Sequence, residues 1–286
     1  MPKLTFTSSG GTIECTLGEL AGNNPYTIAN IEGLAPADAQ INLTEMALND
    51  GAFFNSAKVM YRTINVALAI EYMAEEWRLN AYKVFRPKKP IRIDYKSARL
   101  DVFIEGYVKR VSVPHFDMKQ ILTVEIVCPY PYFKAAQEIK TELNKVVRSF
   151  HMPFAIEATD PVPLGYMQSV SNVTVTNDGE AETPLKMIFR AQAPVTNPKV
   201  TNYVTGDFFG LDITMSAADE ITIDGEDKTV TLVRAGVASN IFNYISKDIT
   251  WLTLEQGANT FTYSVDSGDP EDLIVDFYHY DLHTGV

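Results

Sequence analysis

The chain has 286 residues, of which 46% are hydrophobic and 21% charged, a composition that excludes long disordered stretches. This length exceeds the usual ~100 to 200 residues of one domain, so we expect two domains. No run approaches the ~20 apolar residues of a membrane helix, and the first residues lack the basic start and apolar core of a signal peptide. We therefore expect folding in a cytosol and no membrane partner.

The net charge of −12 is unevenly distributed. Residues 1–150 hold 18 lysines and arginines against 16 aspartates and glutamates, whereas residues 151–286 hold 6 against 20. This asymmetry supports a domain boundary, and it disfavours direct nucleic-acid binding by the acidic half because phosphate would be repelled. Either the carboxylates mainly confer solubility, which explains most of the asymmetry, or they dock a basic partner surface.

The N-terminal half is predicted to be rich in strands. Its first sixty residues mix short apolar runs with turn residues, which indicates short strands and long connections. A β-branched run over 59–70 predicts a buried strand, and apolar residues at a period near 3.6 predict an amphipathic helix over 71–85. An antiparallel meander should follow, with strands at 91–95, 100–113 and 120–128.

A second helix is predicted over 135–150, because apolar residues again recur at helical spacing before a proline-rich passage. We therefore expect an N-terminal domain at 1–150, a linker at 151–166 and a C-terminal domain at 167–286. In this last domain, short strands with turns about every 8 to 12 residues predict an antiparallel β-sandwich, and Asp224-Gly225 gives the clearest hairpin signal. The expected fold class is mainly β with one or two helices.

The sequence contains no GxxxxGKS/T phosphate loop, no GxGxxG turn, no HExxH helix and no GxSxG elbow. It therefore lacks the motifs that indicate nucleotide-binding and dinucleotide-binding proteins, zinc proteases and esterases. Its four histidines offer little acid–base chemistry near neutral pH. We expect no enzyme activity, no catalytic residues, no cofactor and no metal site.

Three features that suggest ligands or redox chemistry have simpler interpretations. His279 and His283 would share a metal on a helix, but the strand predicted there separates their rings by ~13 Å, so an exposed strand end is favoured. The acidic run 219–227 fails the EF-hand template and predicts an exposed hairpin turn. Cys15 and Cys128 lie in no CxxC or Cys/His cluster and are expected to be buried.

Carbohydrate or receptor recognition is the first alternative function, because β-sandwiches can present an aromatic platform. Trp251, Tyr244 or Phe208-Phe209 would provide one. A core position is favoured for these aromatics, since Trp251 lies between Ile249 and Leu252 in a strand-like run. A cell-wall hydrolase is a third class, but among many carboxylates no pair is singled out.

Five segments carry a family resemblance. They are CPYPYF at 128–133, FHMPF at 150–154, VTNDGEAETPLKMIFRAQAPVTNPKVTN at 175–202, LEQGANTFTYSVD at 254–266 and the closing Gly285-Val286. From about Ile91 onward, this series resembles the distal tail protein (Dit) family of long-tailed phages, the siphovirus-type tail component family. The sequence departs from it at Thr183-Pro184, where a glycine is expected after the threonine. It also lacks the long insertions that carry carbohydrate-binding modules in enlarged relatives.

The resemblance implies a structural virion protein, a distal tail or baseplate hub. Similar proteins place their N-terminal domains in a hexameric ring, or in two stacked rings, that joins the major tail tube protein to the tail-tip or tail-associated lysin protein. Their C-terminal domains are galectin-like sandwiches to which receptor-binding proteins attach. The resemblance therefore implies a location at the virion tail tip, after synthesis and assembly in the host bacterial cytoplasm.

Phe53 and Phe54 are the candidate subunit contact. They follow the turn Asn49-Asp50-Gly51 and look exposed, so they either anchor a neighbouring subunit or fill the domain's own core. Edge strands and long loops before Val59 would suit a ring, which needs a heterologous interface whose rotation closes. The sequence leaves open whether the free protein assembles or waits for a partner that templates the ring.

Overall fold

A computed structural model of the chain describes residues 2–16, 25–46, 50–70, 74–114, 120–142, 144–147, 166–169 and 172–286. The fold is mainly β, as expected. The chain divides into two compact units: an N-terminal unit of Met1–Ala136 together with Leu282–Val286, and a C-terminal unit of Gln137–Asp281. In the described part, no helix is long and apolar enough to span a membrane.

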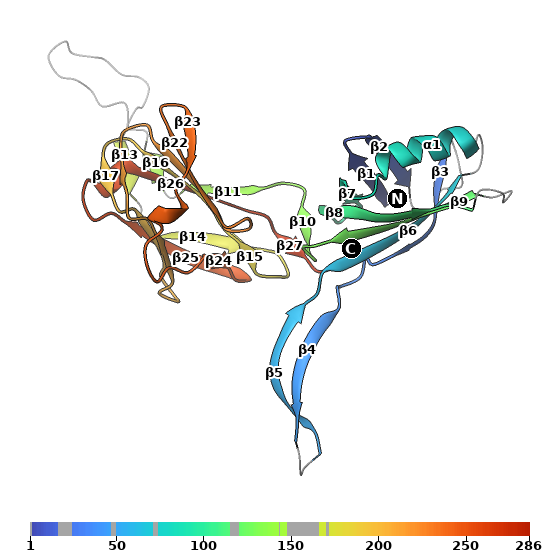
Figure 1. Cartoon of the computed structure of the whole chain (residues 1–286). Helices are drawn as coiled ribbons and strands as arrows, with labels where there is room; N and C mark the ends of the chain where they lie inside the picture. The colour runs from blue at the N-terminus through green and yellow to red at the C-terminus, as the bar shows by residue number, and fades with distance from the viewer. Residues whose placement is uncertain are drawn as a thin grey trace. The chain divides into compact units, whose positions relative to one another are not determined.

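The N-terminal unit contains a nine-stranded antiparallel sheet (Figure 1). The main path of this sheet runs through β2 (Gly11–Thr16), β1 (Lys3–Ser8), β7 (Pro90–Lys96), β8 (Asp101–Ser112), β9 (Gln120–Cys128), β6 (Arg62–Ile70) and β3 (Tyr26–Glu32). A short strand, β10 (Phe133–Ala135), pairs with β8 and with β27 (Leu282–His283). The end of the chain thus completes the N-terminal sheet.

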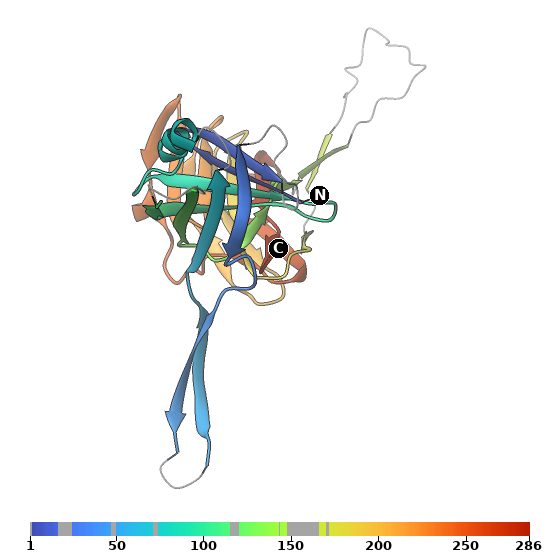
Figure 2. The ribbon, with the colours of Figure 1, turned by 90° about the vertical axis from the view of Figure 1, so that its right-hand side faces the viewer.

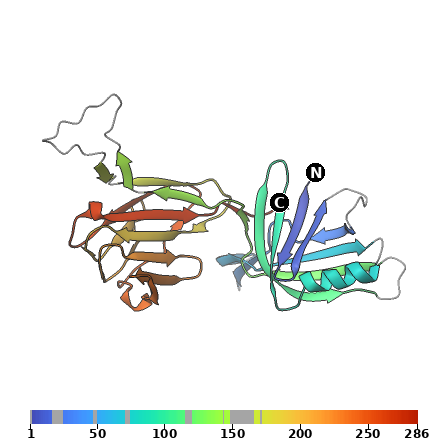
Figure 3. The same ribbon diagram turned by 90° about the horizontal axis from the view of Figure 1, so that it is seen from above.

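One helix, α1 (Ala74–Val84), lies against β1, β2 and β6 (Figure 3). Acidic residues in its first turn and Lys83 in its last turn suit the helix dipole. Its buried residues join the core of the sheet, where the rings of Phe6 and Phe85 meet edge to face at 5.4 Å. The predicted helix and meander are confirmed.

The C-terminal unit is an antiparallel β-sandwich, as predicted. The strands of its larger sheet are, in order, β11 (Ile139–Glu142), β26 (Leu273–His279), β16 (Lys186–Ala191), β21 (Glu220–Asp224), β22 (Thr229–Arg234) and β23 (Val237–Asn240). The strands of its smaller sheet are β14 (Val173–Asn177), β25 (Gly257–Ser264), β18 (Lys199–Asn202) and β19 (Phe208–Gly210). Phe261 of β25 and Phe277 of β26 lie 5.1 Å apart between the sheets, in one shared core.

Short pairs and single turns complete this unit. They are β12 (Asn144–Val147) with β13 (Tyr166–Ser169), β15 (Thr183–Pro184) with β24 (Thr253–Leu254), β17 (Val195–Thr196) with β20 (Thr214–Met215), and the 3-10 turns η1 (Phe242–Tyr244) and η2 (Pro270–Asp272). The hairpin predicted at Asp224-Gly225 is confirmed, because β21 and β22 pair with Ile223 opposite Val230.

The helix predicted over residues 135–150 is wrong. The described part of this segment forms β10, β11 and β12, and Ile139 pairs with His279 of β26. An edge position on the larger sheet satisfies the backbone of this segment, so tertiary pairing overrides a helical spacing of apolar residues. Residues 148–150 lie outside the described residues.

The compact units do not coincide with the ranges predicted for the domains. The C-terminal unit begins at Gln137, inside the expected 1–150 domain, and residues 282–286 return to the N-terminal unit instead of staying in 167–286. Residues 151–165 of the expected linker lie outside the described residues. The C-terminal unit is therefore an insertion, with two covalent connections to the N-terminal unit.

Candidate assembly interface

A two-stranded ribbon, β4 (Ala39–Glu45) and β5 (Ala52–Val59), stands clear of the sheet of the N-terminal unit (Figures 1 and 2). Every residue of both strands is exposed. β4 follows β3 and β5 leads into β6, so the ribbon leaves the sheet from a neighbouring pair of strands. We call residues 33–38 and 60–62, through which the ribbon joins the sheet, its root.

A bulge sets the faces of the ribbon. Asn42 pairs with Ser56 and Leu43 pairs with Phe54, which leaves Asn55 as an extra residue on β5. Strict alternation along β5 would put Phe54 on the same face as Ser56, whereas the bulge turns it to the opposite face. Phe54 therefore shares a face with Leu43 and Ile41.

The two faces differ sharply in polarity. One face is mainly apolar: it consists of Ala39, Ile41, Leu43, Ala52, Phe54, Ala57 and Val59, together with the charged Glu45, which pairs with Ala52. The other carries amides and hydroxyls that bond across the strands, with Asn42 Nδ2 donating to Ser56 Oγ at 2.9 Å and Asn55 Nδ2 to Thr44 Oγ1 at 2.7 Å. Phe53 lies on this polar face, because it pairs with Thr44.

The apolar face lacks a core of its own. Ile41 and Leu43 are each 58% exposed and Phe54 is 67% exposed. A two-stranded hairpin is only marginally stable alone, and a contiguous exposed apolar face marks an interaction site. The ribbon therefore has the properties of an element that another surface covers.

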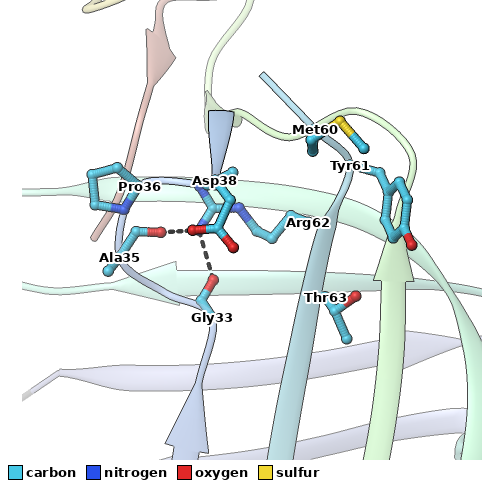
Figure 4. A pocket seen from close by; sticks show the side chains of 9 residues that line it. Gly33, Ala35, Pro36, Asp38, Met60, Tyr61, Arg62 and Thr63 are labelled. Atoms are coloured by element: carbon cyan, nitrogen blue, oxygen red, sulfur yellow. Dashed lines mark hydrogen bonds between the residues drawn. The ribbon is translucent and has the colours of Figure 1, made fainter. Parts of the chain in front are cut away.

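A pocket of about 420 Å³ lies at the root of the ribbon (Figure 4). It is lined by Gly33, Ala35, Pro36, Ala37, Asp38, Met60, Tyr61, Arg62 and Thr63. Both arms of the root contribute to this lining. The first rung of the ribbon closes beside it, where the Met60 amide donates to the Asp38 carbonyl at 2.8 Å.

Arg62 is buried in the root, with 3% of its surface exposed. Its Nη1 donates to the carbonyls of Gly33 and Ala35, both at 2.6 Å (Figure 4). Its Nε donates to the Pro131 carbonyl at 2.8 Å, and its Nη2 to the Thr284 carbonyl at 2.5 Å. One guanidinium thus holds four backbone carbonyls from three separate segments of the chain.

The charge of Arg62 is stabilised by dipoles and by an aromatic ring. No carboxylate among the described residues forms an ion pair with it, and its guanidinium carbon lies 4.7 Å from the centre of the Phe133 ring. Burial lowers the pKa of Arg62 from its ordinary value, but an arginine stays protonated at any physiological pH. Carbonyl acceptors and the ring face replace the water that the cation loses.

Two glycines let the backbone pack tightly at the root. Gly33 has φ +90°, and a Cβ there would lie 2.1 Å from the Thr63 carbonyl oxygen. A Cβ on Gly285 would lie 3.0 Å from the Leu34 carbonyl oxygen. The Val286 amide donates a hydrogen bond to the same oxygen at 3.1 Å. The end of the chain is therefore pressed against the arm that leads into β4.

Both candidate contact residues lie on the ribbon. Phe53 is 61% exposed and Phe54 is 67% exposed, so the alternative that they fill the domain's own core is wrong. The structure places them on opposite faces, and only Phe54 joins the apolar one. Their role as a subunit contact stays a prediction.

The aromatic residues weighed for sugar binding differ in exposure. Trp251 is partly buried, and the centre of its ring lies 4.9 Å from the centre of the Phe209 ring. Lys228 Nζ lies 4.8 Å from the centre of the Trp251 ring. Tyr244, in η1, is about half exposed, so the core position expected for it is wrong. Trp251 packs against the core of the C-terminal unit. Stacking of a sugar needs an open ring face, so this position does not suit a sugar platform.

Among the other residues singled out in the sequence, His279 differs most from expectation. It is buried in β26, whereas His283 lies in β27 of the N-terminal unit, so the exposed strand end expected for His279 is wrong. Burial lowers the pKa of His279, and its Nε2 lies 3.7 Å from an Asp281 oxygen. Cys15 and Cys128 are buried as expected, which raises the pKa of each thiol to about 12.

Three residues that the structure makes central were not predicted from the sequence: Arg62, Ile41 and Leu43. Arg62 carries a usable signal, because it stands in the inward phase of the alternation Ile64, Val66, Leu68 and Ile70. An arginine in that phase predicts a buried cation. Ile41 and Leu43 alternate along one short strand, but nothing in the sequence shows that the strand has no sheet to cover it.

Comparison with known proteins supports the resemblance seen in the sequence. Residues 178–277 match the family model of the siphovirus-type tail component, C-terminal domain. This part of the C-terminal unit is therefore similar to a siphovirus-type tail component domain. The match spans strands of both sheets of the sandwich, from the turn after β14 to β26.

Similarity to solved structures extends beyond this tail component domain. The structure resembles that of the SPP1 Dit (gp 19.1) protein, described as a paradigm of the hub adsorption apparatus in phages that infect Gram-positive bacteria, with a TM-score of 0.68, 10% identity and 98% of each chain covered. A chain of the phage P2 baseplate in its activated conformation with Ca has a TM-score of 0.52, 12% identity and 98% of each chain covered. At these identities the similarity shows the fold. No curated protein sequence matches this chain.

Proposed function

We propose that this chain is a distal tail or baseplate hub protein of a phage or phage-like tail, whose copies close into a ring through the ribbon. The family match in the C-terminal unit and the full-length likeness to a phage hub protein support the hub role. The exposed apolar face of the ribbon is the observation that carries the ring, because it requires a covering surface. The role is structural, without catalysis.

A second copy of the chain is the occupant that we propose for the apolar face. We propose that the ribbon of one copy lies on a different surface of its neighbour, and not on the neighbour's ribbon. Such a contact is heterologous, and it closes into a ring when the rotation between neighbours divides a full turn. We propose six subunits, in one ring or two stacked rings, with Phe54 as the main anchor and Phe53 as a contact from the polar face.

The energetics favour cooperative assembly. Burying the remaining surface of Ile41, Leu43 and Phe54 contributes roughly 1 to 2 kcal/mol for each side chain. Such a total is comparable to the cost of fixing two proteins together, so one contact alone is weak. In a closed ring every subunit donates one ribbon and accepts another, and a partner that gathers subunits raises their effective concentration.

The further partners follow from the hub role. We propose that the ring joins the major tail tube protein to the tail-tip or tail-associated lysin protein, at the virion tail tip. The galectin-like identity of the sandwich and the attachment of receptor-binding proteins to it belong to the same proposal, as does docking of a basic partner by its acidic surface. Assembly in the host bacterial cytoplasm is part of the same proposal.

Mixing the purified chain with the tail tube protein of the same phage tests the hub role. In negative-stain images, we expect a disc at one end of each tube. A matched variant, Leu43→Thr with Phe54→Thr, replaces two large apolar side chains by polar ones that still suit a strand, and it should leave the tubes uncapped. Tubes that bind no wild-type protein would contradict the proposal.

A further inference from the structure

The four carbonyls that Arg62 holds fall into two pairs with different places in the chain. Gly33 and Ala35 belong to the arm of the root that leads into β4. Pro131 and Thr284 lie in the N-terminal unit next to β10 and β27, the two strands that connect this unit to the C-terminal unit. Arg62 itself is the last residue of the other arm and the first residue of β6. One side chain therefore links both arms of the ribbon to both connections.

The two connections are closed on each other inside the N-terminal unit. The chain leaves this unit after Ala136 and returns at Leu282. There β10 and β27 pair antiparallel, with Phe133 opposite His283 and Lys134 opposite Leu282, and both Phe133 and Leu282 are buried. The ring of Phe133 lies against the Arg62 guanidinium. The returning strand thus brings the Thr284 carbonyl to the guanidinium.

We propose that Arg62 is a positioning residue that ties the root of the ribbon to these paired connections, so that residues 282–286 help to fix the orientation in which the ribbon assembles. We call Arg62, its four carbonyls and residues 282–286 the clasp. The effect of the clasp on how the ribbon assembles rests on the proposed function. The clasp itself is a set of contacts within one chain, so it is present without assembly.

The chemistry of the guanidinium suits this role. Its donors point in fixed directions within one plane, so it can hold carbonyls on several sides at once, whereas an ammonium is a compact charge with rotatable donors. Loss of the Thr284 acceptor would leave a buried N–H of a cation without its partner, which is unfavourable. The tight approach of Gly285 to Leu34 and Pro36 adds a steric fit on the same side.

Hydrogen exchange of the free, full-length chain tests the clasp. The reporter is the Met60 amide, which donates to Asp38 in the first rung of the ribbon, and the reference amides are those of β9 in the core. Two variants open the clasp by different routes. Arg62→Lys keeps the charge but loses the planar guanidinium and its several donors. Gly285→Val leaves Arg62 unchanged, but its side chain clashes with Leu34 and Pro36 and so displaces the end of the chain from the root.

We expect exchange at Met60 to accelerate roughly tenfold in both variants, the effect of losing about one hydrogen bond to a charged group, while exchange in β9 stays unchanged. Arg92→Lys is the matched control, because Arg92 also covers a phenylalanine, Phe103, at 3.7 Å, but lies away from the root. It should leave Met60 unchanged. Wild-type exchange at Met60 in both clasp variants would overturn the proposal, as would equal acceleration of Met60 and β9, which signals general unfolding.

The hydrogen-exchange test of the clasp does not depend on the test of the ring, since exchange is measured at concentrations at which the chain is monomeric. A wild-type chain that never forms a ring would refute the ring, and Met60 would still report on the clasp. A wild-type ring together with unchanged exchange in both variants would refute the clasp alone.

Discussion

Leu43 and Phe54 face each other across the ribbon on its apolar side, and they do so because the bulge at Asn55 shifts the register of β5 by one residue. Neither side chain has a core to enter. Cross-strand pairs of this kind stabilise a ribbon locally, but most of their surface stays available for a partner. This pair is therefore the centre of the interface that we propose.

The two phenylalanines of the ribbon should contribute unequally to assembly. Phe54→Thr removes the largest side chain of the apolar face and is expected to raise the concentration for half-assembly by about tenfold or more, as hot-spot residues do. Phe53→Thr, on the polar face, should have a clearly smaller effect. Sedimentation velocity over a concentration series measures both. Equal effects would show that the assignment of faces does not govern the contact.

Gly33→Ala should destabilise the N-terminal unit by about 2 to 4 kcal/mol, because the new Cβ meets the Thr63 carbonyl in a left-handed backbone conformation. Gly51 also has positive φ, but nothing lies within 4 Å of a Cβ built there. Its change to alanine should cost only about 1 kcal/mol. Urea unfolding followed by Trp77 fluorescence in a Trp251→Phe background measures both, and similar losses at the two sites would contradict this explanation.

His279 should make the C-terminal unit sensitive to acid. Burial holds its pKa below the ordinary 6.5, against the opposing effect of nearby carboxylates on Asp281, Asp178 and Glu138. The unfolded chain then binds more protons, so the contribution is complete above about pH 6.5 and declines as pH falls from there through the lower folded pKa. Relative to His279→Leu, the wild type should lose stability between pH 7 and 5. Parallel pH profiles, measured by Trp251 fluorescence in a Trp77→Phe background, would contradict this.

The ion pair between Arg190 and Asp276 should couple strongly. Asp276 is buried, and its carboxylate contacts Arg190 and lies 3.2 Å from Lys140 Nζ. Arg190→Met should cost about 3 kcal/mol, because it removes one partner of a buried charge. Adding Asp276→Leu should recover most of that loss. Denaturant unfolding of the four proteins forms a double-mutant cycle, and additive losses would refute the coupling.

Much of the fold is encoded in local patterns. Alternation in β6, β8 and β9 and the helical period of α1 predict their elements, because each element buries one face on a single core. The helix predicted over 135–150 is wrong because the apolar spacing suits a helix, whereas β11 (Ile139–Glu142) pairs with β26 at the edge of a sheet. No local signal reveals such a distant partner.

The candidate interface was only partly predictable. The sequence singled out Phe53 and Phe54, which the structure places on the ribbon. The faces of the ribbon depend on the extra Asn55, and period-two alternation cannot reveal a bulge. Arg62 is detectable from its inward phase in β6. Its partners are not, because every residue offers a carbonyl and only the folded chain selects Gly33, Ala35, Pro131 and Thr284.

Light scattering of the purified chain over a concentration series, with and without the tail tube protein, shows whether the ribbon builds a ring. For the wild type we expect a species of about six times the 31.8 kDa chain mass, or twice that for stacked rings. The Leu43→Thr, Phe54→Thr variant should remain monomeric under the same conditions. A wild type that stays monomeric in both conditions, or a variant that forms the same ring, would contradict a ring built through the ribbon.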